Sequence, residues 1–122
     1  MRKITVAVLF LLMTTTANAG ASLWGIRGEL WQKNNEFQKF MYVQGVLDGL
    51  VFSEFTIHET KVTTSIDSLQ YVKAIDTLYG DYRNQLIPVP FLMRIITLEL
   101  NGEEKNIIEK ELTSYRAYFA TK

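Results

Sequence analysis

Residues 34–55 form a long stretch without proline, in which apolar side chains recur at steps of three and four. That spacing predicts an α-helix, and the stretch is long enough for about six turns. The helix is expected to begin at Asn34 or Asn35, because asparagine is a favoured N-cap; with Asn35 as cap, Gln38 completes a capping box. Apolar residues cover most of its circumference, which predicts a central, buried helix. They are Phe37, Phe40, Met41, Val43, Val46, Leu47, Leu50, Val51, Phe52 and Phe55.

Residues 56–64 are polar and are expected to form a loop. A second helix is expected to follow, capped by Thr64 or Ser65. Asp67 and Ser68 are expected in its first turn. The helix is expected to run to Gly80, with 81–84 as a frayed last turn. Its apolar stripe comprises Ile66, Leu69, Val72, Ile75, Leu78, Tyr79 and Tyr82.

Pro90 is well placed to begin a third helix that ends at Leu100. Residues 96–100 alternate as in a strand, but no partner strand follows, so a helix with a C-terminal cap at 101–102 is favoured. Residues 103–120 are expected to form the last helix. Its stripe comprises Ile108, Leu112, Tyr115 and Phe119.

The lead-in before the first long helix holds three glycines and two tryptophans. We expect one helical turn around 29–32, with Trp24 and Trp31 against the core. The whole pattern predicts a single all-α domain over 20–122, a compact bundle of about four helices with short connections.

Residues 1–19 have the three parts of a secretory signal peptide. Arg2 and Lys3 are basic, 4–13 are apolar except for one threonine, and Ala17-Asn18-Ala19 matches a cleavage site. The apolar run is shorter than the ~20 residues that a membrane-spanning helix needs. We therefore expect export, cleavage after Ala19 or alternatively after Ala21, and no membrane attachment afterwards. A signal of this form in a chain without cysteine favours a bacterial periplasm.

Charge and cysteine content exclude several classes of function. Removal of Arg2 and Lys3 leaves the mature chain with two more acidic than basic residues, so nucleic acid is not an expected partner. His58 is the only histidine and no cysteine is present, which leaves too few soft ligands for zinc. No phosphate-binding glycine loop is present. We expect no metal, no cofactor and no enzymatic activity.

Gly45 and Gly49 lie one turn apart in the middle of the first long helix, with Asp48 between them. Glycine destabilises a helix interior, so the pair predicts a close helix crossing, either inside the bundle or at an external interface. Asp48 falls on a face with aromatic residues and is expected to need a partner: Arg83, Arg94 or a tyrosine hydroxyl. The alternative is a perturbed carboxylate at a functional pocket.

A second group of candidate residues lies at 79–84, where tyrosine and arginine, the usual interface anchors, are concentrated. We expect Tyr82 to pack into the core and Arg83 to reach Asp48 or Asp81. The polar loop 57–64 is the other candidate partner surface. The candidate partner-binding residues are therefore His58, Glu59, Tyr79, Asp81, Tyr82, Arg83 and Asn84.

The run from Tyr42 to Leu50, with Gly45, Asp48 and Gly49, resembles a signature of small periplasmic helical proteins related to the Tai-type immunity proteins of type VI secretion. The order of segments also matches, with an export signal, this helix, a helix introduced by 65–70, and a proline-containing junction. The resemblance implies that the protein binds and blocks a peptidoglycan-cleaving amidase in the periplasm, often as a dimer.

The sequence therefore predicts a non-enzymatic periplasmic binding protein, with an immunity protein against a cell-wall amidase as its specific form. The alternative is a structural or chaperone-like periplasmic protein, which would expose an apolar patch or form a homodimer around Gly45 and Gly49. A small hydrolase that uses Asp48 or His58 is the least favoured function.

Overall fold

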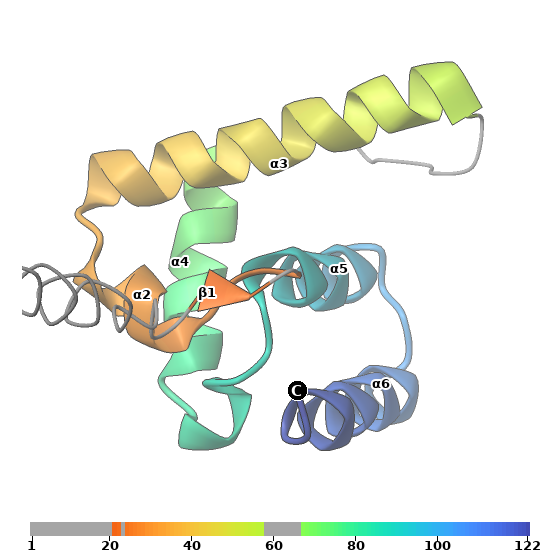
Figure 1. The fold of residues 1–122 in the computed structure, drawn as a ribbon. Helices are drawn as coiled ribbons and strands as arrows, with labels where there is room; N and C mark the ends of the chain where they lie inside the picture. The colour runs from red at the N-terminus through yellow and green to blue at the C-terminus, as the bar shows by residue number, and fades with distance from the viewer. Residues whose placement is uncertain (1–20, 23, 58–66) are drawn as a thin grey trace, which may run out of the picture.

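The computed structural model describes residues 21–22, 24–57 and 67–122, with side-chain burial for 24–50 and 67–122. The expected signal peptide and the candidate residues His58 and Glu59 lie outside these ranges. Figure 1 shows the elements in order. They are β1 (Ala21–Ser22), β2 (Gly25–Ile26), α2 (Gly28–Lys33), α3 (Glu36–Ile57), α4 (Ser68–Tyr79), the 3₁₀ turn η1 (Tyr82–Asn84), α5 (Val89–Leu100) and α6 (Lys105–Phe119).

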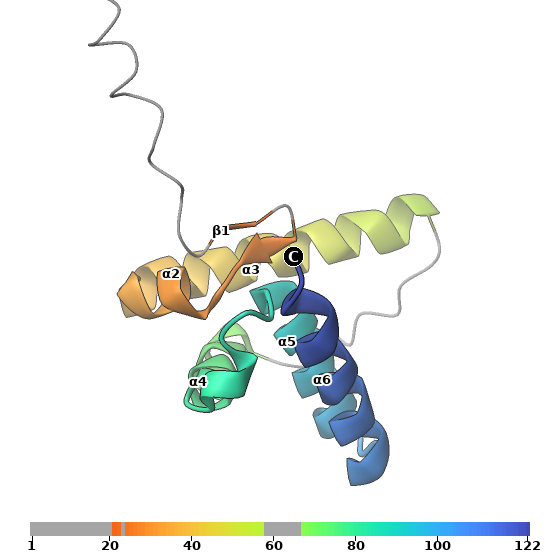
Figure 2. The same cartoon turned by 60° about the horizontal axis from the view of Figure 1, so that its bottom comes forward.

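The described chain is an all-α bundle, as the helical spacing predicts. α3 packs on α4, α4 on α5, and α5 on α6. Figures 1 and 2 show that the C-terminal part of α3 extends beyond the other helices. The one sheet within the described ranges is the short antiparallel pair β1–β2, which the sequence analysis does not predict. No helix in these ranges combines the length and apolarity required to cross a membrane.

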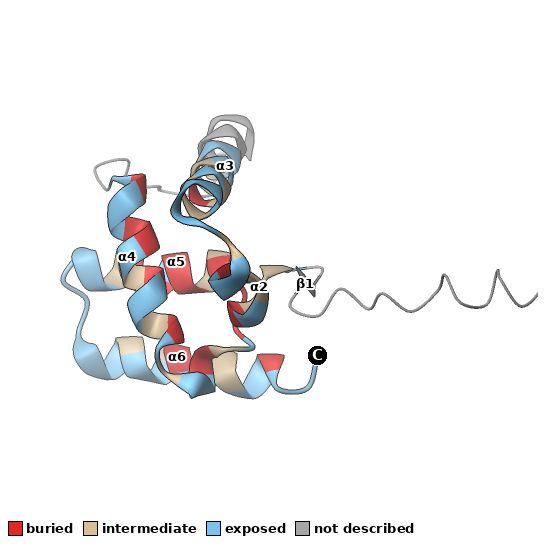
Figure 3. Ribbon diagram, turned by 90° about the vertical axis from the view of Figure 1, so that its left-hand side faces the viewer, coloured by how far each residue is buried: buried red, intermediate tan, exposed pale blue. Residues whose placement is uncertain are grey.

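The core lies where α2, α4, α5 and α6 face one another, and Figure 3 shows buried residues on these inner sides. Several polar groups are satisfied inside it. The Tyr79 hydroxyl donates to the carbonyl of Ile87 at 2.6 Å, and the Tyr71 and Thr97 hydroxyls are 2.8 Å apart. The largest fully buried side chains are Trp31, Tyr71, Tyr79, Phe119, Ile75, Ile87, Leu92, Ile95, Ile96, Val43, Val89 and Asn84.

The helix ends follow local sequence signals closely. At the start of α3, the Asn35 N–H donates to Gln38 Oε1 and the Gln38 N–H donates to Asn35 Oδ1, both at 2.9 Å, so the capping box is confirmed. α5 carries proline in its first turn and ends at Asn101, with Gly102 at φ +77°. The C-terminal cap at 101–102 is therefore confirmed, and 96–100 is helical rather than extended.

The expected cap of α4 is wrong. The cap is Asp67, whose carboxylate accepts from the Leu69 N–H at 3.2 Å, rather than Thr64 or Ser65. The expected stripe is confirmed for Val72, Ile75 and Tyr79, which are buried, and wrong for Leu69, which is half exposed. By contrast, the stripe expected on α6 is confirmed, since Leu112 and Phe119 are buried and its other two members pack against the core.

The expectation that α3 is buried on nearly all sides is wrong for the residues described. Val43 is fully buried, but Phe37 is 70% exposed and Met41 is 51% exposed. α3 lies at the edge of the bundle and packs mainly on α4, so only one side of it is covered. Its apolar residues on the opposite side have no neighbouring helix.

Candidate functional site

Side-chain contacts on the inner side of α3 fix its rotation. Lys39 Nζ lies 2.8 Å from Asp76 Oδ1 of α4, and the Trp31 indole N–H donates to the same oxygen at 2.7 Å. The Tyr42 hydroxyl accepts from the Ile26 N–H at 3.2 Å, which ties α3 to β2. With Val43 also directed inward, the opposite side of the helix faces solvent.

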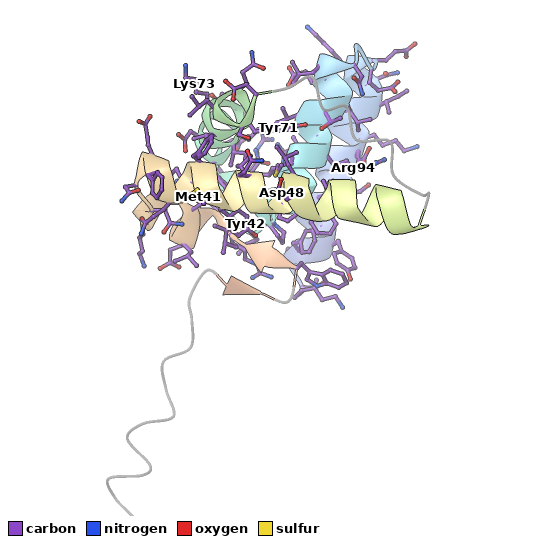
Figure 4. All side chains as sticks on the ribbon, turned by 90° about the horizontal axis from the view of Figure 1, so that it is seen from above. Met41, Tyr42, Asp48, Tyr71, Lys73 and Arg94 are labelled. Carbon is purple, nitrogen blue, oxygen red and sulfur yellow. The ribbon has the colours of Figure 1, made fainter. Side chains whose placement is uncertain are left out.

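The residues on that solvent side form what we term the outward face of α3: Phe37, Met41, Gly45, Asp48 and Gly49. All five are exposed. Four of them are spaced four residues apart and so follow one ridge of the helix surface. Figure 4, seen from above, labels Met41 and Asp48 along the helix. The face therefore combines two large apolar side chains, two glycines and one carboxylate.

The two glycines of the outward face are not used by the fold of the chain itself. A Cβ placed at Gly45 or at Gly49 would meet no atom within 4 Å among the described residues. Gly25 is different, because a Cβ there would lie 2.9 Å from Pro90 Cδ and its φ is +120°. A crossing inside the bundle at Gly45 and Gly49 is therefore wrong for the part of the chain that the structure describes, where no helix covers that side. The external interface stays a prediction.

Replacing Gly45 or Gly49 by alanine is expected to stabilise the isolated domain by about 0.5–1 kcal/mol each, because the methyl group has free space and alanine favours the helix. Urea denaturation monitored by circular dichroism would measure this. Gly25→Ala is the matched control and should destabilise. A loss of stability for either α3 variant would show that the fold does require the glycine.

Among the described residues, Asp48 pairs with none of the partners expected for it, Arg83, Arg94 or a tyrosine hydroxyl. Its carboxylate accepts from Gln44 Nε2 at 3.1 Å, and Gln44 Oε1 accepts in turn from the Ser68 hydroxyl at 2.8 Å. The two arginines considered as partners are engaged elsewhere. Arg83 pairs with Asp81 at 2.6 Å, and Arg94 pairs with Glu111 at 2.6 Å. None of the ion pairs among the described residues includes Asp48.

A second exposed feature is the η1 turn. Asp81 caps it by accepting from the Arg83 N–H at 3.0 Å, and the Arg83 guanidinium returns to the same carboxylate. Arg116 of α6 lies 3.5 Å from Asp81 and holds the turn from the other side. Tyr82 is 83% exposed, so its expected place in the core is wrong. The turn presents Tyr82 to solvent on a backbone that these pairs hold in place.

Two other candidate residues of this region are structural. Tyr79 is buried, and desolvation raises the pKa of its phenol well above the ordinary value. Asn84 is buried as well; its Nδ2 donates to the Leu78 carbonyl at 2.8 Å and its Oδ1 accepts from Arg116 Nε at 2.8 Å. Neither side chain is available to a partner, so their assignment as partner-binding residues is wrong.

The Asp81 carboxyl is expected to titrate unusually low. Hydrogen bonds from the Arg83 side chain and backbone lower its pKa from 3.8 to about 2. Because this pKa is lowered, the ionised Asp81 carboxylate stabilises the folded state at pH values above 3.8. That contribution is lost as the pH falls toward about 2. NMR titration would measure this, and Arg83→Ala should return the pKa toward its ordinary range. An ordinary Asp81 pKa in the unaltered protein would contradict the pairing.

Within the described ranges no three acidic or histidine side chains are grouped so that they could hold a metal ion. Among the large apolar side chains that are exposed in the described ranges, Tyr82 and Phe37 have the highest exposed fractions, at 83% and 70%. The sequence singles out Gly45, Asp48, Gly49 and Tyr82, with a place in the core expected for Tyr82 and either a crossing inside the bundle or an external interface for the glycines. It does not predict that Phe37 and Met41 are exposed beside them.

Comparison with known proteins adds no relative: no protein-family model, no curated protein and no solved structure matches the chain. The resemblance to Tai-type immunity proteins is therefore still a prediction.

Proposed function

We propose that the mature chain is a non-enzymatic periplasmic protein that binds another protein and, in the form we favour, blocks a cell-wall amidase. One observation carries the binding role. Gly45 and Gly49 weaken the helix that contains them, and the described fold gains nothing from their lack of side chains. Departures from local stability rules of this kind are expected where a chain contacts something else.

The η1 turn supports the same role. A tyrosine beside an arginine is a common interface anchor, and an anchor already held in place loses little conformational entropy on binding. Tyr82 meets this description, because the Asp81–Arg83 pair and Arg116 order the turn that carries it. The protein therefore has two candidate contact regions on different elements.

An amidase as the partner is inferred from the sequence resemblance. The resembling run begins at Tyr42 and includes Gly45, Asp48 and Gly49, three residues of the outward face of α3. A signature shared for packing reasons would be buried, whereas these three positions are exposed. Their exposure fits a signature related to binding.

The test is an inhibition assay with purified secreted peptidoglycan amidases, including any encoded beside the gene for this protein. The purified mature protein should suppress release of soluble fragments from peptidoglycan at near-stoichiometric amounts. Its co-production should also protect cells in which the inhibited amidase is directed to the periplasm. Tyr82→Ala should weaken inhibition, while Leu100→Ala, an exposed change at the end of α5, should not. Unchanged hydrolysis in the presence of excess protein would refute the amidase role.

The exposed Phe37 and Met41 also suit the alternative of a chaperone-like protein, because such proteins present apolar surface to unfolded chains. That function predicts suppression of client aggregation without any specific partner. A protein that inhibits an amidase but does not delay aggregation of an unfolded test protein would exclude the alternative.

A further inference from the structure

The chemistry of a partner for the outward face of α3 is constrained by Asp48. This residue lies between Gly45 and Gly49 in the sequence and is exposed beside them. A partner close enough to use the space above the glycines therefore also covers the Asp48 carboxylate. Covering a carboxylate without supplying an opposite charge is strongly unfavourable, because the lost hydration is not replaced.

The chain itself supplies no cation to Asp48 within the described ranges. Among the described residues the carboxylate accepts from Gln44 Nε2, and none of their ion pairs includes it. Lys39 is the single basic residue in the sequence of α3. Its ammonium group is held at 2.8 Å from Asp76 and lies over the Trp31 ring, on the inner side of the helix. No cation among the described residues is left for Asp48, so we take the positive charge to come from a partner.

We propose that the outward face of α3 binds a positively charged amphipathic helix of another protein. The backbone of that helix crosses α3 at Gly45 and Gly49, where the absence of side chains permits close approach. Its apolar residues pack on Phe37 and Met41, and a lysine or arginine pairs with Asp48. This inference rests on the proposed function in one respect, since both require a protein partner.

A second copy of the chain fits the same face poorly. Pairing of two α3 helices through their outward faces brings together apolar residues, glycines and two Asp48 carboxylates. The single basic residue that each helix could contribute, Lys39, is already paired on the opposite side. Pairing of α3 on α3 would thus cover both carboxylates without a cation from either helix, which charge complementarity disfavours.

Site-specific photo-crosslinking of the full-length chain in its native host tests this proposal. Benzoylphenylalanine replaces Phe37 on the outward face, Tyr82 on η1, or Leu100 at the end of α5 as an exposed control. The Phe37 probe is expected to crosslink to another polypeptide. Mass spectrometry should map the joined segment to an amphipathic helix that contains lysine or arginine. The Leu100 probe should give no such product.

Charge reversal then tests the role of Asp48. Asp48→Lys should reduce the Phe37 crosslink by about tenfold or more, because it places like charges opposite each other. Glu99→Lys, a matched reversal at an exposed position on α5, should leave the product unchanged. Replacing the mapped basic residue of the partner by glutamate should restore the crosslink to the Asp48→Lys variant. Circular dichroism of each variant checks that the fold is retained.

The proposal would be overturned by a Phe37 crosslink to a second copy of the chain, by a mapped segment without a basic residue, or by a product that is insensitive to Asp48→Lys. A product at Tyr82 with none at Phe37 would also overturn it, yet would leave the proposed function standing. Absence of a product from both probes would count against both.

Discussion

Replacing Trp31 by alanine is expected to lower the free energy of unfolding by about 3–5 kcal/mol. Trp31 is fully buried, its indole N–H donates to Asp76 at 2.7 Å, and the ring lies edge-on to Tyr42. The substitution leaves a cavity and removes the contact that joins α2, α3 and α4. Because small domains have only about 5–15 kcal/mol of stability, this loss removes a large share of it. Urea denaturation monitored by far-ultraviolet circular dichroism measures the loss.

Two further variants make this result interpretable. Trp31→Phe retains most of the ring volume and removes the indole N–H, so it should cost clearly less than the alanine change. Trp24→Ala removes a tryptophan that is half exposed and meets Phe91 and Tyr118 edge-on, and it too should cost less. Equal losses for Trp24→Ala and Trp31→Ala would mean that Trp31 is not the anchor of the N-terminal segment.

Phe119→Ala is expected to lower the free energy of unfolding by about 3–4 kcal/mol. Phe119 is 1% exposed near the end of α6, with ring centroids 4.8 Å from Phe91 and 4.9 Å from Tyr118. Its loss opens a cavity between α5 and α6 and removes favourable edge-to-face aromatic contacts. Thermal unfolding should show a markedly lower midpoint.

The neighbouring Tyr118 provides the control for this prediction. It lies on the same turn of α6 and is half exposed, so Tyr118→Ala should have a much smaller effect than Phe119→Ala. If the two substitutions cost the same, the boundary of the core on α6 has been placed incorrectly.

The features that sequence predicts well here are local ones. The Asn35–Gln38 capping box, the cap at 101–102 and the start of α5 each depend on a few neighbouring residues, and all three are found in the structure. The inward stripe of α6 is also predictable, because only one side of that helix is apolar. Short-range signals of this kind do not depend on how the helices are arranged.

The side of α3 that is buried could not be predicted, because the helix is apolar almost all round. Which side faces the core is decided by contacts distant in sequence, such as Lys39 with Asp76 and Tyr42 with Ile26. Without those contacts, the sequence leaves open whether Gly45, Gly49 and Asp48 face the bundle or an external interface. Tyr82 was misplaced for a similar reason, since α4 ends at Tyr79 and the stripe does not continue into η1.

The anchoring of α2 has a consequence for the order in which the chain acquires its structure. Trp31 and Asp76 are 45 residues apart, and the Gly28 N–H bonds to the Gln85 carbonyl still further along. During synthesis, α2 leaves the ribosome before α4 and η1. It therefore has nothing to pack against until those two elements have been made. α2 can reach its final packing only after most of the chain has been synthesised. Fragments that end before α4 should therefore behave as unfolded chains.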